Sequence, residues 1–153
     1  MKRQVLTEHG FAPVPPPADL GPAGDLPPRA HALEISRRNE ELVAAADVCL
    51  ANLTPFRGAS ADVGTVYELG CAAGMGKHVA AYSNDPRVYR ERVVEQGEGA
   101  ATVRRDAGKL WDSKGVMIED HEMSDNLMLE GGLALRGVSW SWHGPAPAIL
   151  HGT

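Results

Sequence analysis

Apolar and polar positions along the chain predict alternating helices and strands. Apolar side chains recur at helical spacing over 29–46, and the charged side chains of that stretch fall on the opposite face. A short apolar run over 48–53 predicts a buried strand, which must stop before Pro55 because proline lacks a backbone donor. Helical spacing returns over 62–74, and 78–82 predicts a second buried strand. We therefore expect an α/β fold with a mainly parallel sheet.

The pattern is weaker outside this segment. A helix is expected to end near Gly10, and a proline- and glycine-rich loop follows over 14–24. We expect a short charged helix over 88–94 and a polar loop over 108–114. The apolar triplet 116–118 fits either a last strand or part of a loop.

Length and composition favour one domain. The 153 residues are 43% apolar, which suits a single compact domain over 1–153 with its own core. An irregular tail is expected from about residue 138, where Trp140 and Trp142 could dock on the body or on another subunit. Cys49 and Cys71 belong to no CxxC pair and are predicted to be free thiols.

Charge and motif content exclude several classes of function. A net charge of −5 argues against nucleic acid or an anionic membrane as the main partner. No apolar run reaches the ~18–20 residues of a membrane span, and no signal peptide is apparent, so a cytoplasmic protein is expected. The chain has neither a P-loop nor a GxGxxG motif, and its histidines lack ligand spacing. We expect no cofactor and no metal.

Polar chemistry is concentrated in 47–77, where a loop rich in Gly, Pro and Ser leads into a helix. Asp62 is a candidate helix cap, and Thr65 to Glu68 matches a capping box in which Glu68 only bonds a backbone N–H. The alternative makes Glu68 a nucleophile or general base in a cleft, with Asp62 orienting a ligand hydroxyl. On one helix, six positions separate two residues by about 120°, so these carboxylates converge only if Asp62 lies on the loop.

Two separated groups of motifs carry a family resemblance. The first group is TPFRG, ADVGT and YELG within 47–77, and the second is SDNLML over 124–129, preceded by VMIED over 116–120. Together they resemble the nucleoside 2-deoxyribosyltransferase family. The resemblance implies a flavodoxin-like three-layer fold with a mainly parallel sheet. The chain departs from the family at its start, because the first strand and Gly-Pro loop of the family have no counterpart before 2–11.

The resemblance also implies a reaction and the residues that perform it. Glu68 attacks the anomeric carbon of a 2'-deoxynucleoside, Asp62 holds a sugar hydroxyl, and Asp47 assists proton transfer to the leaving base. Deoxyribose then passes through a covalent glutamyl intermediate to a second free nucleobase. The expected substrate-binding residues are Asn52, Phe56, Arg57, Gly64, Asn126 and Met128. In the family, the asparagine at the position of Asn126 reaches a neighbouring subunit, so a homo-oligomer is expected.

Two other functions stay open. One is an N-glycosidase of 2'-deoxynucleosides or their 5'-monophosphates, in which water replaces the acceptor base. The other is a nucleoside-binding protein without turnover. For the later motif, the alternative to an active-site role is that Ser124 and Asp125 only cap a helix over 127–135.

Overall fold

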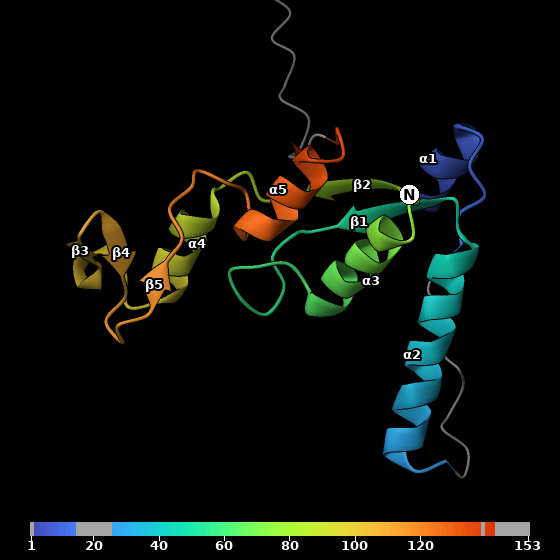
Figure 1. The fold of residues 1–153 in the computed structure, drawn as a ribbon, viewed down its shortest axis with the longest axis horizontal. Coiled ribbons are helices and arrows are strands. Elements are labelled where there is room, and N and C mark those ends of the chain that lie inside the picture. Colours follow the sequence, from blue (N-terminus) through green and yellow to red (C-terminus); the bar gives the residue numbers. More distant parts are fainter. Residues whose placement is uncertain (1, 15–25, 139, 143–153) are drawn as a thin grey trace, which may run out of the picture.

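The computed structural model describes residues 2–14, 26–138 and 140–142. Its main sheet is parallel, in the order β1 (Val48–Asn52), β2 (His78–Ser83) and β6 (Ser141–Trp142) (Figure 1). Both strands predicted from the apolar runs are therefore confirmed. Among the described residues, β1 has a hydrogen-bonded neighbour on one side only.

Helix α3 (Val63–Gly74) packs against the sheet through small residues. Ala72 on the helix and Ala51 and Ala81 on the strands are buried in one cluster, and Leu53 at the end of β1 is fully buried. Alanines at this contact let the helix approach the sheet closely. The cluster also includes Leu133 of helix α5 (Leu127–Ala134), so two helices share one core.

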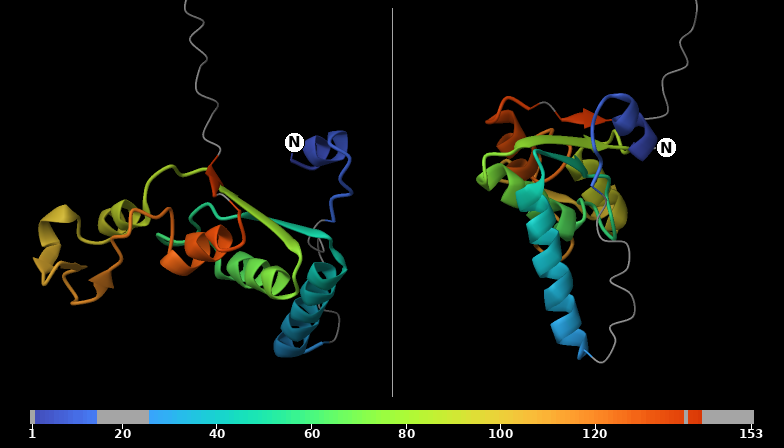
Figure 2. Two further views of the ribbon diagram at one scale, coloured as in Figure 1. Left: turned by 45° about the horizontal axis from the view of Figure 1, so that its top comes forward. Right: turned by 90° about the vertical axis from the view of Figure 1, so that its right-hand side faces the viewer.

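Helix α2 (Pro28–Ala45) projects away from the body and contacts α3 (Figures 1 and 2). The helix has no buried residue. Its exposed face carries Glu34, which pairs with both Arg37 and Arg38. Such exposed pairs contribute little to the stability of a helix, because water screens their charges. The position of α2 therefore depends on its contact with α3.

The remaining elements include a second, antiparallel sheet. They are α1 (Lys2–Glu8), α4 (Tyr89–Gln96), η1 (Ala100–Thr102), β3 (Arg104–Asp106), β4 (Lys109–Trp111) and β5 (Met117–Ile118). The polar loop predicted over 108–114 is wrong in part, because β4 occupies its first half. Ala107 and Gly108 both have positive φ, as a tight hairpin turn requires. Across the hairpin, the Arg104 guanidinium lies 6.0 Å from the ring centroid of Trp111.

The ends of the chain are described in part. The predicted loop 14–24 lies almost wholly outside the described residues, as do 143–153. Strand β6 lies in the tail that was expected to be irregular. Trp140 packs against the core, so its predicted docking on the body is confirmed. Both cysteines are free, and no helix in the described segments is long and apolar enough to cross a membrane.

A buried ion pair joins the loop after β1 to α4 and α5. Arg92 and Asp125 are each 1% exposed, and their charged atoms lie 3.4 Å apart. Arg92 also donates to the carbonyl of Ala59 at 2.7 Å, and to two further carbonyls. Asp125 accepts from the hydroxyl of Ser60 and from the backbone N–H of Ala61 at 3.0 Å. With both charges hydrogen-bonded, the pair tolerates burial.

Removing one partner of this pair should destabilise the fold strongly. We expect Asp125→Ala to lower the free energy of unfolding by ~3–5 kcal/mol, because it leaves the Arg92 charge buried without a counter-charge. Urea unfolding measures the change. The control is Asp120→Ala, which removes a more exposed ion pair with Arg90 and should cost at most about 1 kcal/mol. Equal losses in the two variants would contradict the expectation.

Candidate active site

The loop after β1 folds back on itself at the carboxyl edge of the sheet. Pro55 and Ala61 form a bridge, and the N–H of Phe56 donates to the carbonyl of Ser60 at 3.0 Å. The loop after β2 joins it, because the N–H of Asn84 donates to the Thr54 hydroxyl at 3.0 Å. The two loops therefore lie on one rim of the parallel sheet, where α/β proteins bind ligands.

Three predicted substrate-binding residues lie on this rim. Asn52 accepts two hydrogen bonds from Thr54, one from its N–H at 3.3 Å and one from its hydroxyl at 2.7 Å. The Arg57 guanidinium lies 5.0 Å from the centroid of the Phe56 ring, and both side chains are exposed. Arg57 has a φ of 55°, a conformation that a non-glycine residue rarely adopts. None of these three residues lines the groove at Glu68 that is described below.

Asp62 is the N-cap of α3. Its Oδ2 accepts from the N–H of Thr65 at 2.9 Å and from the Thr65 hydroxyl at 3.2 Å. Its backbone is extended, so it lies on the loop as convergence with Glu68 requires. A Cβ at Gly64 would stand 3.1 Å from this Oδ2, so a glycine there leaves room for the carboxylate.

Glu68 lies in the middle of α3 and does not cap it. The capping box predicted from Thr65 to Glu68 does not form, because Thr65 is already inside the helix. Within the described residues, no hydrogen bond occupies the Glu68 carboxylate. Burial and then the charge of Asp62 raise the pKa of Glu68. The Glu68 charge also contributes to the raised pKa of Cys49 on β1, after burial of the thiol. Glu68 is therefore an unpartnered carboxyl group beside a second carboxylate.

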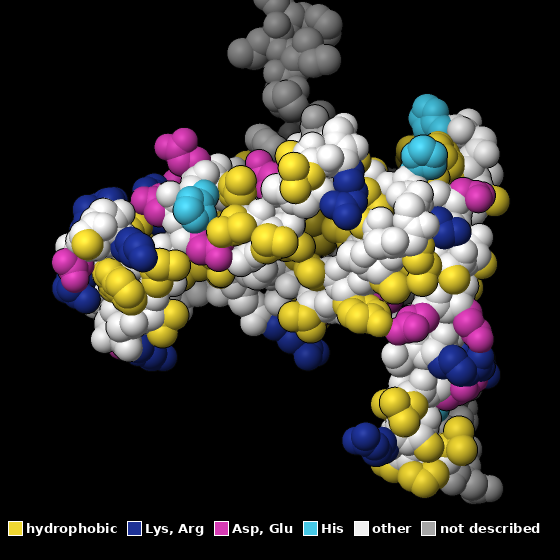
Figure 3. Space-filling model, in the orientation of Figure 1, with side chains coloured by type: hydrophobic (Ala, Val, Ile, Leu, Met, Phe, Trp, Pro, Cys, Tyr) yellow, Lys and Arg dark blue, Asp and Glu magenta, His cyan; other side chains and the backbone are white. Residues whose placement is uncertain are grey.

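Glu68 faces a groove of about 260 Å³ between α2 and α3. Figure 3 shows the hollow between the projecting α2 and the body. Helix α3 contributes Gly64, Tyr67, Glu68 and Cys71, and α2 contributes Ala32, Ile35, Ser36, Asn39, Glu40 and Val43. The α2 wall was not predicted, because the charged residues of that helix were expected to face water, whereas Glu40 lines the groove. A signal was present, since Ser36 and Asn39 fall within the apolar stripe.

Two hydrogen bonds hold α2 beside α3. The Tyr67 hydroxyl donates to Glu40 Oε1 at 2.5 Å, and the Lys77 ammonium donates to the carbonyl of Ala44 at 2.7 Å. The bond to Glu40 is the main cause of the raised pKa of Tyr67. Since α2 has no buried residue, we infer that these two bonds help to set the distance between α2 and α3, and so the width of the groove.

Asp47 does not line the groove. It is exposed at the amino end of β1, and its carbonyl accepts from the N–H of His78 at 3.3 Å. Asp47 thus lies at the opposite end of β1 from the rim that carries Asn52.

Asn126 is the N-cap of α5, which corrects the alternative that Ser124 and Asp125 form the cap. Its Oδ1 accepts from the N–H of Met128 at 3.0 Å, and its Nδ2 donates to Glu119 at 2.8 Å. Met128 is 72% exposed. Neither Asn126 nor Met128 lines the groove of its own chain.

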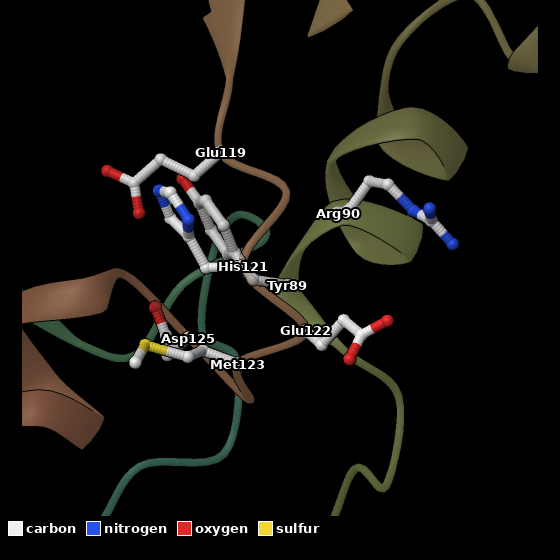
Figure 4. Close-up of a pocket in the computed structure, with 7 residues that line it drawn as sticks. All are labelled: Tyr89, Arg90, Glu119, His121, Glu122, Met123 and Asp125. Carbon is white, nitrogen blue, oxygen red and sulfur yellow. The ribbon is translucent and has the colours of Figure 1, made fainter. Parts of the chain in front are cut away.

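A second indentation lies where α4 meets the segment 119–125 (Figure 4). It is lined by Tyr89, Arg90, Glu119, His121, Glu122, Met123 and Asp125. It has no room for a water molecule, and the Arg90 side chain points away from the others in Figure 4. Across the described segments, no three His, Cys, Asp or Glu residues are grouped as a metal site would need. The groove at Glu68 is therefore the better candidate site.

Neutralising Asp62 should lower the pKa of Glu68. The Asp62 charge disfavours ionisation of Glu68, so Asp62→Asn should shift the Glu68 titration to lower pH while burial keeps part of the shift. Asparagine also caps helices, so α3 should stay intact. Carbon-13 NMR titration of the glutamate carboxyls, with Glu68→Gln for assignment, measures the pKa. Asp106→Asn on the distant hairpin is the control, and an equal shift there would refute the pairing.

Loss of the Tyr67 hydroxyl should loosen α2. In Tyr67→Phe the bond to Glu40 is absent, so backbone amides of α2 should exchange hydrogen faster while those of α3 keep their protection. Hydrogen-exchange mass spectrometry measures both. The matched control is Glu41→Gln, which weakens a pair on the exposed face of α2 and leaves the contact with α3 intact. Unchanged exchange in Tyr67→Phe would show that this bond does not hold the helix.

Comparison with known proteins identifies the family. Residues 1–128 match the family model described as nucleoside 2-deoxyribosyltransferase. A Schizosaccharomyces pombe protein described as uncharacterized is 28% identical over 144 residues, which cover 88% of this chain and 68% of that protein.

A solved structure is also similar. The 2-desoxiribosyltransferase from Leishmania mexicana superposes with a TM-score of 0.58 at 26% identity, covering 84% of this chain and 70% of that one. The α/β fold with a parallel sheet is thus shared with a deoxyribosyltransferase, and a function of that type is supported. The chain belongs to the nucleoside 2-deoxyribosyltransferase family.

Proposed function

We propose that this protein transfers 2-deoxyribose between the nucleobases of 2'-deoxynucleosides through an ester on Glu68. The observation that carries the proposal is the position of Glu68. Its carboxyl group faces a groove of about 260 Å³, is free of hydrogen bonds within the described residues, and lies near the N-cap Asp62. A carboxylate with a structural role is normally in an ion pair or accepts a hydrogen bond at a helix end, whereas a nucleophilic carboxylate must have an oxygen that can reach the substrate.

The reaction is a double displacement. A Glu68 oxygen forms a bond to C1' while the bond between C1' and the base nitrogen breaks, and its electron pair leaves with the base. A second base then attacks C1' from the vacated face and releases the Glu68 carboxylate. Two inversions return the original configuration, as in retaining glycosidases.

The two neighbouring acids have separate tasks. Asp62 uses Oδ2 for the helix cap, and its Oδ1 makes no hydrogen bond within the described part of the chain, so Oδ1 can accept from a sugar hydroxyl. Asp47 assists proton transfer to the departing base, a role that rests on membership of the family. Asn52, Phe56 and Arg57 contact the substrate at the rim.

A base-exchange assay tests the reaction. The protein is incubated with a 2'-deoxynucleoside and an excess of a different free base, and the products are separated by chromatography. A new deoxynucleoside is expected, and Glu68→Gln should reduce its formation on the order of 10³-fold or more, because the nucleophile is lost. Asp47→Asn should slow the first displacement. Glu91→Gln, an exposed acid on α4, is the matched control and should behave as wild type.

The same assay separates the alternatives. Free base without a new deoxynucleoside would assign the protein as an N-glycosidase. Nucleoside binding without any product, unchanged in Glu68→Gln, would assign a binding protein. A wild-type rate in Glu68→Gln would sink the proposed mechanism.

Asn126 is proposed to act on the groove of a neighbouring subunit within a homo-oligomer. A mixing experiment tests this role. We expect Glu68→Gln and Asn126→Ser to be nearly inactive alone, since serine preserves the α5 cap, lacks the amide and adds no charge beside Glu119. Refolded together they should regain activity, because a mixed assembly contains one site with both native residues. A monodisperse monomer in light scattering that turns over substrate would refute the assembly.

A further inference from the structure

Glu119 holds the start of α5 through two hydrogen bonds. It follows β5 directly, and its Oε1 accepts from the Nδ2 of Asn126 at 2.8 Å, while its Oε2 accepts from the N–H of Leu127 at 3.0 Å. Within the described residues, no lysine or arginine pairs with Glu119. The nearby Arg90 pairs with Asp120 instead, and its side chain points away from Glu119 in Figure 4. The two oxygens of Glu119 are therefore used by N–H groups at the N-terminus of α5.

These contacts fix the orientation of the Asn126 carboxamide. Its Oδ1 accepts from the N–H of Met128 at 3.0 Å, while its Nδ2 donates to Glu119. Turning the amide over would set Nδ2 against an N–H and Oδ1 against a carboxylate, so both contacts would become repulsive. A carboxamide has two N–H donors, and in the described part of the chain only one of them is bonded. Asn126 therefore keeps one free N–H, whose direction is set by these two contacts.

The cap of α5 does not need the bond between Asn126 and Glu119. A side-chain oxygen that accepts from an N–H of the first turn is enough to cap a helix, and Oδ1 of Asn126 does this. The bond from Nδ2 is additional, and Glu119 is half-buried in making it. A second residue that fixes an amide beyond the needs of the cap is typical of a side chain whose remaining donor acts on a ligand or a reacting group.

We propose that Glu119 is a positioning residue, which orients Asn126 so that its free N–H donates to Glu68 of the partner subunit. This inference rests on the proposed role of Asn126 in the groove of a neighbouring subunit. An ionised carboxylate can only accept hydrogen bonds, and Glu68 has none within the described residues. A donor is thus the group that Glu68 lacks. Glu119 does not line the groove of its own chain, so it acts through Asn126.

Loss of this orientation should slow the reaction without weakening substrate binding. Glu119→Gln keeps the size of the side chain, but its single oxygen cannot accept from both Asn126 and Leu127. We expect kcat for base exchange to fall about tenfold or more, while KM for the deoxynucleoside stays within about twofold, because Asn126 bonds the nucleophile and not the substrate. The matched control is Glu122→Gln, an exposed acid of the same segment, which should behave as wild type.

A swap of the two side-chain types separates positioning from a purely structural role. In the double variant Glu119→Gln/Asn126→Asp, the introduced aspartate accepts from the N–H of Met128 and from the introduced glutamine amide. The glutamine oxygen accepts from the N–H of Leu127, so all three contacts return, but the aspartate has no N–H to donate. We expect the swap to melt close to wild type, whereas kcat stays as low as in Glu119→Gln.

Two results of the swap would overturn the inference. A wild-type kcat in the double variant would show that the contact is only structural. Asn126→Asp alone sets two carboxylates against each other and should melt earlier than wild type. A double variant that melts as early as Asn126→Asp would refute the assigned hydrogen bonds.

The outcomes also distinguish this inference from the proposed reaction. If the wild type transfers deoxyribose and Glu119→Gln keeps the wild-type kcat, the positioning role is overturned while the reaction stands. If no chain transfers deoxyribose, carbon-13 NMR titration of Glu68 replaces the assay. A hydrogen-bond donor favours the ionised carboxylate, so its loss in Glu119→Gln should raise the pKa of Glu68. Since Asn126 does not line the groove of its own chain, this change has to come from another subunit, and an unchanged titration would overturn the inference.

Discussion

The buried pair of Arg92 and Asp125 is the constraint on which the candidate site depends. Arg92 comes from α4, and Asp125 precedes α5, yet both bond the loop that follows β1. That loop leads directly into Asp62 and the start of α3. Because an unpaired buried charge is costly, the loop, α4 and α5 must come together for either charge to be satisfied. The position of Glu68 is thereby fixed by residues that do not touch the groove.

The two walls of the groove differ in how firmly they are held. Helix α3 packs into the core through Leu69 and Ala72, so Glu68 stands on a rigid element. Helix α2 has no buried residue, packs on the core through the partly buried Val43, and is bonded to Tyr67 of α3 and to Lys77 beyond it. A rigid wall suits the nucleophile, which needs accurate placement. A loosely held wall suits bases of different shape.

Sequence patterns predicted the elements with periodic or continuous apolar positions, namely α2, α3, β1 and β2. The hairpin over 104–111 was missed because its strands are short and depend on pairing across the turn, as between Arg104 and Trp111. The bond between Arg92 and Asp125 joins residues 33 positions apart, and no local pattern encodes it. Motif resemblance identified Glu68 and Asp62, whereas the α2 wall of the groove could be recognised only once the fold set α2 against α3.

Helix α3 fixes the spacing between Asp62, its N-cap, and Glu68, which lies within the helix. Asp62 must lie at the N-cap to satisfy the N–H of Thr65, and Glu68 follows at a separation that helix geometry fixes. One Asp62 oxygen is used by the cap, which leaves the other for a ligand. Its charge also raises the pKa of Glu68. A ligand hydroxyl that bonds Asp62 would offset part of that repulsion, so binding of the sugar would favour the ionised form of Glu68 that attacks it.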